Sequence, residues 1–313
     1  MENSKEIYDC IIVGGGCAGY PAAVYAARFN MKTLLIAKEP GGLITTTHLV
    51  ENYPGFISLS GPELADKLKE HVIANNVPMI DDIVTLIEKD ENTKLFTIKT
   101  GIMEDEYLAK TVILATGTQH KHLGASGEWD FQSKGVSYCA TCDGPFFKKK
   151  TVAIVGGGDT AAKEAMVLAQ TCEKVYMFIR SYLKAEPINA DRIRKIENVE
   201  IIEGVNVTKI CGDKKVTHVE LDKEVNGSNK VELSAVFIAI GMDPQNELAK
   251  QLGVELNKRG EVIINRVSET NVAGVFAAGD LTNAEWKQGI IAAAEGSVAS
   301  YSAFEYLQNL QDD

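Results

Sequence analysis

The chain contains two glycine-rich turns of the same kind, each placed between a predicted strand and a predicted helix. The first is Gly14-x-Gly16-x-x-Gly19, and the second is Gly156-x-Gly158-x-x-Ala161. Short apolar runs predict strands at 8–13, 33–36, 151–155 and 174–179, and helix formers follow each turn, at 22–27 and up to residue 169. Such units bind nucleotides, because backbone N–H groups at the start of the helix approach a pyrophosphate. Two of them, about 140 residues apart, predict a duplicated nucleotide-binding domain.

Three further apolar strands end in glycine, at 111–117, 235–241 and 274–280. A helix is predicted from Gln288 to about Leu310. The strand at 274–280 and this helix are predicted to return the chain to the first domain, since they would be surplus in the second. Alternating apolar residues at 95–98 and 216–221 predict a small antiparallel ribbon in each domain.

Length and charge limit the classes of function. A chain of 313 residues is long enough for two domains. The formal net charge of −11 argues against a nucleic-acid partner, which needs a concentrated basic surface. No apolar run reaches the roughly 20 residues that span a bilayer, and no apolar signal core precedes the first strand. We therefore expect a cytoplasmic protein with no membrane partner.

A cysteine pair, Cys139-Ala-Thr-Cys142-Asp143-Gly144, lies between the two glycine turns. A CxxC pair is compatible with a zinc half-site, a structural disulfide or a redox dithiol. Zinc needs two further ligands, and no second CxxC exists; His120 and His122 complement it poorly and are interpreted as part of a linker between domains. The redox dithiol is the favoured interpretation, and no metal site is predicted. Asp143 is placed to shuttle a proton, to form a turn, or to do both.

The other four cysteines carry no predicted redox role. Cys10 lies in a predicted strand and Cys17 in the first glycine turn, where packing is the simpler interpretation. Cys172 and Cys211 have no partner that the sequence indicates.

The second glycine turn is interpreted as a site for a pyridine dinucleotide. Selection of NAD usually places an acid at the end of the second strand, whereas NADP requires basic residues there. Residues 178–185 contain no acid, and Arg180 and Lys184 are available for a 2′-phosphate, although two separate cations are also ordinary at a surface.

Two C-terminal features suit a flavin. Asp280 ends an apolar strand beside Gly279, which favours a carboxylate bonded to ribityl hydroxyls, with a helix or turn cap as the alternative. Lys287, Gln288 and Gly289 open the last helix, where free N–H groups and the helix dipole stabilise an anionic reduced flavin.

Taken together, these motifs resemble the low-molecular-weight thioredoxin reductases, within the flavoprotein disulfide reductases. The resemblance covers essentially the whole chain. It is carried by the segments 14–19, 41–42, 45–47, 51–55, 115–117, 139–144, 156–161 and 278–280. It implies an α/β fold with two Rossmann-like domains of three-layer ββα type, the second inserted into the first. Residues 1–120 with 246–313 would bind FAD, and 121–245 would form the nicotinamide-binding domain that carries the CxxC pair.

The resemblance also implies individual binding residues. For FAD these are Gly14, Gly16, Cys17, Ala18, Gly19, Lys38, Gly41, Gly42, Leu43, Thr46, Thr47, Asn52, Val84, Ala115, Thr116, Gly117, Gly279, Asp280, Lys287, Gln288 and Gly289. For the nicotinamide cofactor they are Gly156, Gly158, Asp159, Thr160, Ala161, Arg180 and Lys184.

By the same resemblance, Cys142 takes electrons from the flavin, Cys139 attacks the disulfide of thioredoxin or a thioredoxin-like protein, and Asp143 is the acid–base group. The family alternates between two domain orientations and usually forms homodimers. NADPH is the expected electron donor.

Three positions depart from the family pattern. The basic motif for the 2′-phosphate is reduced to Arg180 and Lys184, Leu43 replaces the usual glutamine, and Pro145 precedes the aromatic pair Phe146-Phe147 that contacts thioredoxin. The weakened basic motif makes a thioredoxin reductase that takes electrons from ferredoxin or another carrier the first alternative. A dithiol oxidase that uses oxygen and a flavin-containing redox sensor without turnover are separate alternatives.

Overall fold

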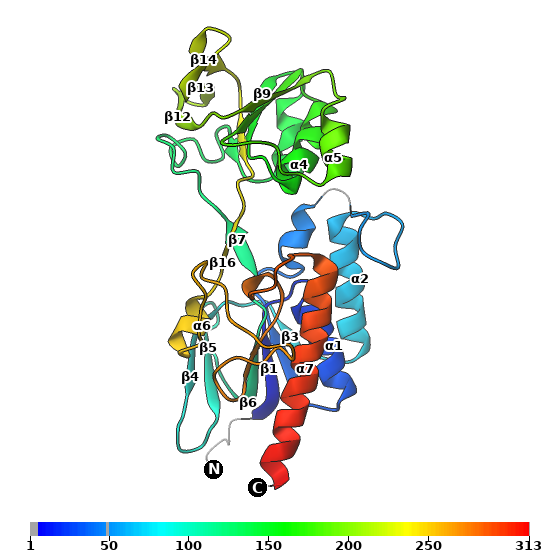
Figure 1. Ribbon diagram of the computed structural model, residues 1–313. Helices are drawn as coiled ribbons and strands as arrows, with labels where there is room; N and C mark the ends of the chain where they lie inside the picture. Colours follow the sequence, from blue (N-terminus) through cyan, green and yellow to red (C-terminus); the bar gives the residue numbers. More distant parts are fainter. Residues whose placement is uncertain (1–5, 48–49, 313) are drawn as a thin grey trace. The chain divides into compact units, whose positions relative to one another are not determined.

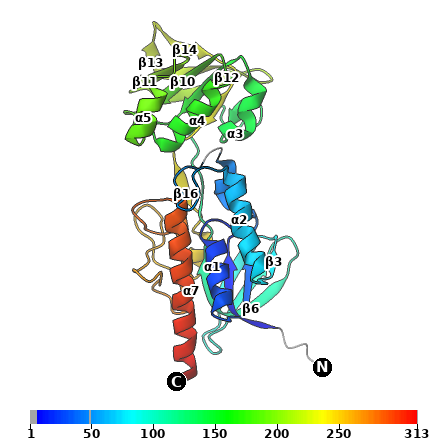
Figure 2. The same cartoon turned by 90° about the vertical axis from the view of Figure 1, so that its right-hand side faces the viewer.

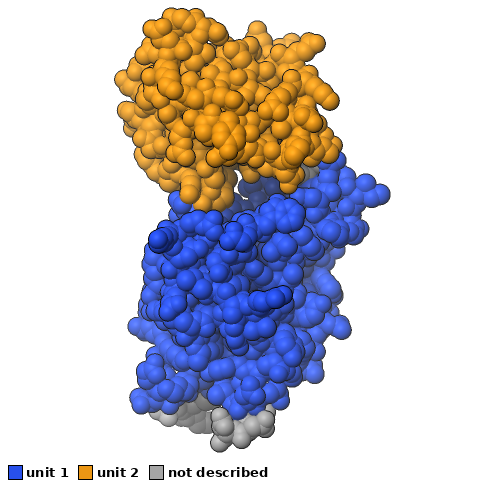
Figure 3. Space-filling model, viewed as in Figure 1, with its two compact units in different colours: residues 1–119, 243–313 blue, residues 120–242 orange. Residues whose placement is uncertain are grey.

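The computed structural model describes residues 6–47 and 50–312, apart from the side chains of residues 311 and 312. The chain divides into two compact units, coloured separately in Figure 3. Unit 1 comprises the residues up to Gln119 together with those from Asp243 onward, and unit 2 comprises His120–Met242. Unit 2 is therefore an insertion in the sequence of unit 1, and both units have the α/β architecture with parallel strands that the sequence predicts.

Unit 1 is built around one sheet (Figure 1). Its N-terminal elements are β1 (Ile7–Val13), α1 (Gly19–Arg28), β2 (Thr33–Ile36), η1 (Gly42–Thr46), α2 (Gly61–Ala74), β3 (Met79–Ile80), β4 (Val84–Lys89), β5 (Phe96–Thr100) and β6 (Glu106–Leu114). Its C-terminal elements are α6 (Glu247–Gln251), β17 (Val275–Ala277), η3 (Gly279–Leu281) and α7 (Gly289–Asp312).

Strands β3, β2, β1 and β6 are parallel neighbours, and the end of β6 also pairs with β17. This pairing confirms the prediction that the segment near 274–280 returns to the first domain, and α7 matches the helix predicted from 288. The prediction of a separate antiparallel ribbon at 95–98 is wrong. Strand β5 pairs with β6 as well as with β4, so it belongs to the main sheet.

Alternating side chains place two apolar cores on opposite faces of this sheet. Cys10 and Ile12 of β1 point to the core beneath α1 and α7, whereas Ile11 and Val13 point to the core shared with β4, β5 and α6. Helices α1, α2 and α7 lie on the same side of the sheet in Figures 1 and 2. The close fit of α7 on α1 needs a glycine, because a Cβ at Gly296 would lie 2.1 Å from the Ala18 carbonyl oxygen.

Unit 2 repeats the pattern on a smaller scale. Its elements are β8 (Val136–Ser137), α3 (Ala140–Asp143), η2 (Gly144–Phe147), β9 (Thr151–Val155), α4 (Asp159–Ala169), β10 (Lys174–Ile179), α5 (Pro187–Ile193), β11 (Val199–Glu203), β12 (Val207–Gly212), β13 (Val216–Val225), β14 (Ser228–Glu232) and β15 (Val236–Ile238). Strands β11, β10, β9, β15 and β8 form a parallel sheet, and β12, β13 and β14 form the antiparallel ribbon predicted near 216–221.

The chain passes between the units twice, through β7 (Thr118–His120) and β16 (Met242–Pro244), which pair as a two-stranded sheet. His120 therefore does lie in a connecting segment, as its interpretation as a linker residue requires. Among the described helices, none is long and apolar enough to cross a membrane.

Candidate functional site

The first glycine turn is built so closely that it accepts only glycine at two positions. Gly14 has a φ of +115°, and a Cβ there would lie 2.1 Å from the Ala115 carbonyl oxygen. A Cβ at Gly19 would lie 1.8 Å from the Gly14 carbonyl oxygen. A Cβ at Gly16 would meet no atom closer than the Gly41 carbonyl oxygen, at 3.8 Å. The turn thus leaves a cradle at Gly16 that a side chain would fill, which fits the pyrophosphate of a dinucleotide at the start of α1.

A second predicted segment closes on this cradle. The N–H of Gly41 donates to the Gly15 carbonyl at 2.8 Å and to the Tyr20 hydroxyl at 3.0 Å. Gly42 follows with a φ of +62°, and a Cβ there would lie 3.2 Å from the Cα of Gly16. Residues 41 and 42, which the resemblance gives as FAD-binding residues, are therefore backbone neighbours of the first turn.

The C-terminal segment also lies against the first turn. A Cβ at Gly279 would lie 2.9 Å from the Cβ of Ala18, and one at Gly289 would lie 3.5 Å from the Cys17 sulfur. Asp280 is mostly buried at this point, which raises the pKa of its carboxyl, with Lys287 acting in the opposite direction. The structure therefore brings together residues from positions 14–19, 41–42 and 279–289, as expected of one binding site.

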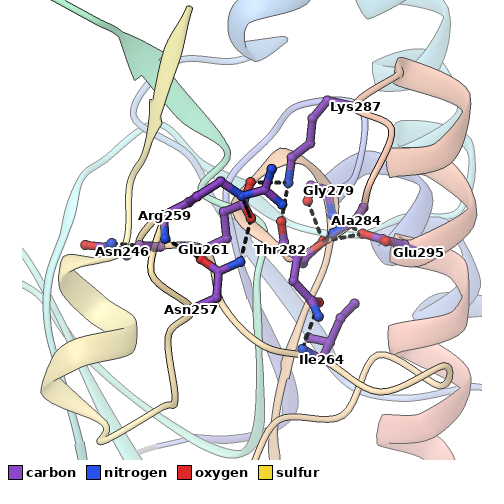
Figure 4. A network of polar contacts seen from close by, with 12 residues as sticks. Asn246, Asn257, Arg259, Glu261, Ile264, Gly279, Thr282, Ala284, Lys287 and Glu295 are labelled. Atoms are coloured by element: carbon purple, nitrogen blue, oxygen red, sulfur yellow. Dashed lines mark hydrogen bonds and ion pairs between the residues drawn. The ribbon is translucent and has the colours of Figure 1, made fainter.

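A network of polar contacts supports this C-terminal segment (Figure 4). One oxygen of Glu295 accepts hydrogen bonds from the Gly279 N–H at 2.8 Å and the Thr282 hydroxyl at 3.0 Å. The ammonium of Lys287 donates to the Thr282 carbonyl and forms an ion pair with Glu261 at 3.2 Å. The side chain of Lys287, which the sequence analysis gives as an FAD-binding residue, is thus held by groups of the protein itself.

The remaining predicted FAD residues lie in several places of unit 1. The Asn52 amide donates to Gln288 at 2.9 Å, joining two residues predicted independently. Thr116 exchanges hydrogen bonds with Gln245, which fastens the segment after β6. The others are placed as follows: Leu43, Thr46 and Thr47 in and after η1, Lys38 exposed after β2, Gly117 with a φ of +64°, and Val84 buried in the apolar core at the start of β4.

Sequence reasoning missed three acids around this site. Glu39 is exposed just after β2, at the strand end where an acid about 20 residues beyond the last fingerprint glycine bonds a ribose. That signal was present in the sequence. Glu261 and Glu295 had no comparable signal, because their partners lie in other segments and are brought to them only by folding.

The second glycine turn repeats the first with one change. A Cβ at Gly156 would lie 2.1 Å from the Ala239 carbonyl oxygen, and Gly158 has no neighbour within 4 Å. Ala161 is buried where the first turn has glycine, and Asp159 and Thr160 open α4 as predicted.

Asp159 serves unit 2 itself. Its carboxylate accepts from the Asn189 amide at 2.7 Å and pairs with Lys163 at 2.8 Å. Burial opposes ionisation, but these partners and the Glu186 N–H outweigh it and lower the pKa of Asp159.

The two predicted cations follow the second strand of unit 2. The backbone N–H of Lys184 donates to the Gly157 carbonyl at 2.6 Å, which places the loop beside the second glycine turn. Arg180 and Lys184 are both exposed, and the Lys184 ammonium lies 4.9 Å from the centre of the Tyr182 ring. The geometry fits cations that are presented near the nucleotide turn.

Cys139 and Cys142 form a disulfide across α3, with their Cα atoms 5.4 Å apart. Cys139 is half-buried and Cys142 is exposed. The Cys139 sulfur accepts a hydrogen bond from the Cys142 N–H at 3.1 Å, and the Ser137 hydroxyl accepts from the Cys139 N–H at 3.1 Å. The N–H of Asp143, which is half-buried, donates to the Cys139 carbonyl. The predicted pairing of these two cysteines is confirmed.

The aromatic pair after this motif does not point in one direction. Phe146 is 81% exposed, whereas Phe147 packs against Phe237 with ring centres 5.9 Å apart. The expectation that both rings face a partner is therefore wrong, since Phe147 is half-buried and packs against the unit 2 core. Only Phe146 is presented next to the disulfide.

The remaining cysteines are reduced. Cys10 and Cys172 are buried, and burial raises the pKa of the Cys17 thiol to about 12, which fits packing roles. Cys211 lies with His218 and Glu220 on one face of the antiparallel ribbon, their ligand atoms all within 4.8 Å of one another. This is the one group in the described part of the chain whose composition suits a metal ion, and the sequence did not predict it.

With this geometry in place, the comparisons with known proteins decide the family. The model for the pyridine nucleotide-disulphide oxidoreductases matches residues 8–298. The chain belongs to this family. The thioredoxin reductase of Listeria innocua is 38% identical over all of this chain and 98% of its own length. The sequence resemblance is thereby confirmed, and the chain is an oxidoreductase of the class that acts on disulfides.

Solved structures agree with this assignment. The thioredoxin reductase of Lactococcus lactis has a TM-score of 0.91 at 35% identity, covering 96% of this chain and 99% of that one. The enzyme of T. acidophilum has a TM-score of 0.89 at 38% identity, with the same coverage. A ferredoxin-flavin thioredoxin reductase of Clostridium acetobutylicum reaches 0.53 at 33% identity, covering 97% of this chain and 99% of that one. The ferredoxin-type structure is thus the more distant.

Proposed function

We propose that this chain is an FAD-dependent thioredoxin reductase, which passes electrons from NADPH through the Cys139–Cys142 pair to the disulfide of thioredoxin or a thioredoxin-like protein. The observation that carries the proposal is a disulfide on α3, placed in sequence between two glycine turns of dinucleotide-binding type. Full-length similarity to thioredoxin reductases supports it.

Unit 1 is proposed as the FAD domain and unit 2 as the nicotinamide domain. The cradle at Gly16, the adjoining backbone of residues 41–42 and the half-buried Asp280 support FAD in unit 1. A bound flavin supplies the chemistry that links a two-electron hydride donor to a disulfide. The chain's own residues bind and orient it, through backbone N–H groups at the first turn and through the segment that Glu295 fastens.

In unit 2, Cys142 is proposed to receive the electron pair, Cys139 to attack the partner's disulfide, and Asp143 to hold and return the proton. Disulfide exchange requires a thiolate as attacking group, so a proton must leave one sulfur and reach the departing one. The half-buried Asp143, bonded through its N–H to the Cys139 carbonyl, is fixed next to the pair. Phe146 is proposed as the aromatic contact for the partner, because it is the exposed ring beside the disulfide.

NADPH is proposed as the donor because Arg180 and Lys184 are exposed at the second turn, with no acid on residues 178–185. Ferredoxin is the competing donor. Rapid anaerobic mixing separates them: bleaching of the flavin by NADPH supports the proposal, and bleaching by reduced ferredoxin alone supports the competitor. A homodimer and a cytoplasmic location are further proposals, tested by light scattering and by cell fractionation.

The direct test is reduction of thioredoxin by the FAD-loaded chain with Cys142→Ser, and with Cys211→Ser as a matched control. We expect Cys142→Ser to lower turnover by at least about 100-fold, because no second sulfur remains to release the mixed disulfide. Cys211→Ser is expected to leave turnover unchanged. Undiminished turnover in Cys142→Ser would refute the mechanism, and reduction of oxygen to hydrogen peroxide while a dithiol substrate is oxidised would identify an oxidase instead.

A further inference from the structure

A carboxyl group that the proposed mechanism does not use lies beside the redox motif. Glu164 is on α4, which packs against α3, and one of its oxygens accepts a hydrogen bond from the backbone N–H of Ala140. Ala140 is fully buried and follows Cys139 directly in the CxxC segment. The carboxyl of Glu164 is thus attached to the backbone of the disulfide loop itself.

The second oxygen of Glu164 is buried, and within the described residues it has no hydrogen-bond partner. An ionised carboxylate here loses hydration at its second oxygen with no hydrogen bond there to offset the loss, so the neutral acid is favoured. Burial accordingly raises the pKa of Glu164 to about 7, with the Ala140 N–H as the opposing influence. A buried polar atom without a partner calls for an explanation in the chemistry of its surroundings.

The charged groups on the elements packed against Glu164 do not supply that explanation. On its own helix, Lys163 pairs with Asp159. Helix α5 turns Asn189, Ala190 and Ile193 inward, while Asp191 and Arg192 are exposed.

The strands beneath α4 also carry no charged group that explains the unpartnered oxygen of Glu164. Strand β9 has no titratable side chain, and on β10 Lys174 pairs with Glu200 while Tyr176 packs on the other face of the sheet. Helix α3 contributes Asp143 and the two cysteines. Asp143 and the cysteine pair are the groups near Glu164 whose charge changes in the proposed reaction, and the pair adjoins Ala140, whose N–H donates to Glu164.

Reduction of a disulfide breaks the S–S bond, takes up two electrons and leaves two sulfurs that bind two protons when fully neutralised. Until those protons arrive, a thiolate carries negative charge next to Ala140. A like charge makes an adjacent carboxyl bind its proton more tightly, and the coupling is reciprocal. A neutral carboxyl here stores one proton close to the sulfurs without adding a second negative charge.

We propose that Glu164 is a positioning residue of the redox pair that binds a proton when Cys139 and Cys142 are reduced and releases it when their disulfide re-forms. The electron pair comes from the enzyme's donor, or from an added dithiol, and leaves to the acceptor disulfide; the proton is exchanged with solvent. This role rests on the proposed function for its biological use. Its test uses dithiothreitol alone, so it succeeds or fails independently of NADPH and thioredoxin.

The experiment equilibrates the FAD-loaded full chain with mixtures of reduced and oxidised dithiothreitol between pH 6 and 9, and counts reduced Cys139 and Cys142 by alkylation and mass spectrometry. Wild type, Glu164→Gln and Glu173→Gln are compared; Glu173 is an exposed glutamate just after α4. The pH dependence of dithiothreitol is common to all three. The equilibrium constant for reduction of the cysteine pair in wild type, divided by that in Glu164→Gln, therefore reports the contribution of the Glu164 carboxyl alone.

We expect that ratio to fall by about tenfold as the pH rises from 6 to 9, which corresponds to a coupling of one pKa unit. Glu173→Gln should follow wild type throughout. A constant ratio at every pH would show a merely structural role and overturn the proposal, as would identical curves. If Glu164→Gln does not fold, infrared difference spectra of the wild type decide: a protonated carboxyl band must appear on reduction near pH 7.5, and its absence contradicts the proposal.

Discussion

The two glycine turns begin alike and end differently. In both, the first glycine has positive φ and would bring a Cβ to 2.1 Å from a carbonyl oxygen, of Ala115 in unit 1 and of Ala239 in unit 2. In unit 1 the turn is then enclosed by two more segments, at residues 41–42 and 279–289. In unit 2 the loop that contains Lys184 approaches Gly157, and Gly158 has open space beside it.

This difference matches two kinds of occupant. A turn enclosed by segments far apart in the sequence holds a ligand through many groups fixed before it binds, which favours slow release. A turn with one adjoining loop and exposed cations suits a ligand that binds and leaves in each cycle. We infer that unit 1 retains its dinucleotide as a resident cofactor and that unit 2 exchanges one as a substrate.

The largest expected effect comes from adding one methyl group to each turn. Gly14→Ala places a Cβ against the Ala115 carbonyl at a positive φ, so the turn must move. We expect FAD to be lost on purification, with at least a 100-fold fall in flavin affinity measured by fluorescence.

Gly156→Ala is the matched variant, with the same 2.1 Å conflict against Ala239. It should keep FAD but lose its reduction by NADPH, read from the flavin absorbance. If both variants lose FAD, or both keep normal reduction by NADPH, the division of roles between the turns is wrong.

The next effect concerns the support of the enclosed turn. Glu295→Ala removes the acceptor of the Gly279 N–H and the Thr282 hydroxyl, and a buried donor left without a partner costs about 1–3 kcal/mol. We expect flavin affinity to fall by about tenfold or more. Glu295→Gln keeps a carbonyl acceptor and should bind FAD nearly as wild type does. Equal losses of flavin affinity in the two variants would attribute the effect to the burial of this side chain rather than to its hydrogen bonds.

A smaller effect is expected at the open turn. Arg180→Ala removes an exposed cation from the loop beside the second turn. The KM for NADPH should rise about tenfold with the KM for NADH unchanged, because only NADPH carries the 2′-phosphate. Lys215→Ala, which changes an exposed lysine in the turn between β12 and β13, serves as control. An equal rise in the KM for both nucleotides in Arg180→Ala would show that Arg180 does not recognise the 2′-phosphate.

The smallest effect is a dependence of stability on pH. The folded-state pKa of Asp159 is lowered, so its stabilising contribution is present above the unfolded value of about 4 and is lost as the pH falls through the folded value. Asp159→Asn should cost about 0.5–1 kcal/mol at pH 7 in urea unfolding, through loss of the Lys163 pair. The gap between variant and wild type should narrow as the pH falls below about 4, and a gap that does not narrow in acid would contradict this assignment.

The sequence could predict the parts of the site that are recognised within one short segment. It could not predict the contacts that join segments far apart in the chain. The motifs of the glycine turns and of the cysteine pair are local, because Gly19 meets Gly14, Gly156 meets Ala161 and Cys139 meets Cys142 within a few residues. The contacts of the carboxylates that support the site are not local. Glu295 reaches Gly279 because α7 packs against η3, and no periodicity marks which acid will do so.

The same reasoning explains the two corrections. Phe146 and Phe147 are adjacent, and which ring turns inward depends on the position of Phe237 on β15. The ribbon expected at 95–98 has the right alternation, but the length of β6 decides that β5 joins the main sheet. Both outcomes depend on partners that a local pattern does not contain.

The central claim is that one nucleotide-linked cofactor and one disulfide accept electrons in the same chain. An anaerobic titration of the FAD-loaded protein with NADPH, followed by flavin absorbance and by thiol counting, tests it most directly. The account predicts that wild type consumes about two equivalents, one for the flavin and one for the Cys139–Cys142 pair, and that Cys142→Ser consumes about one. Consumption of one equivalent by both proteins, with no thiols formed in wild type, would contradict it.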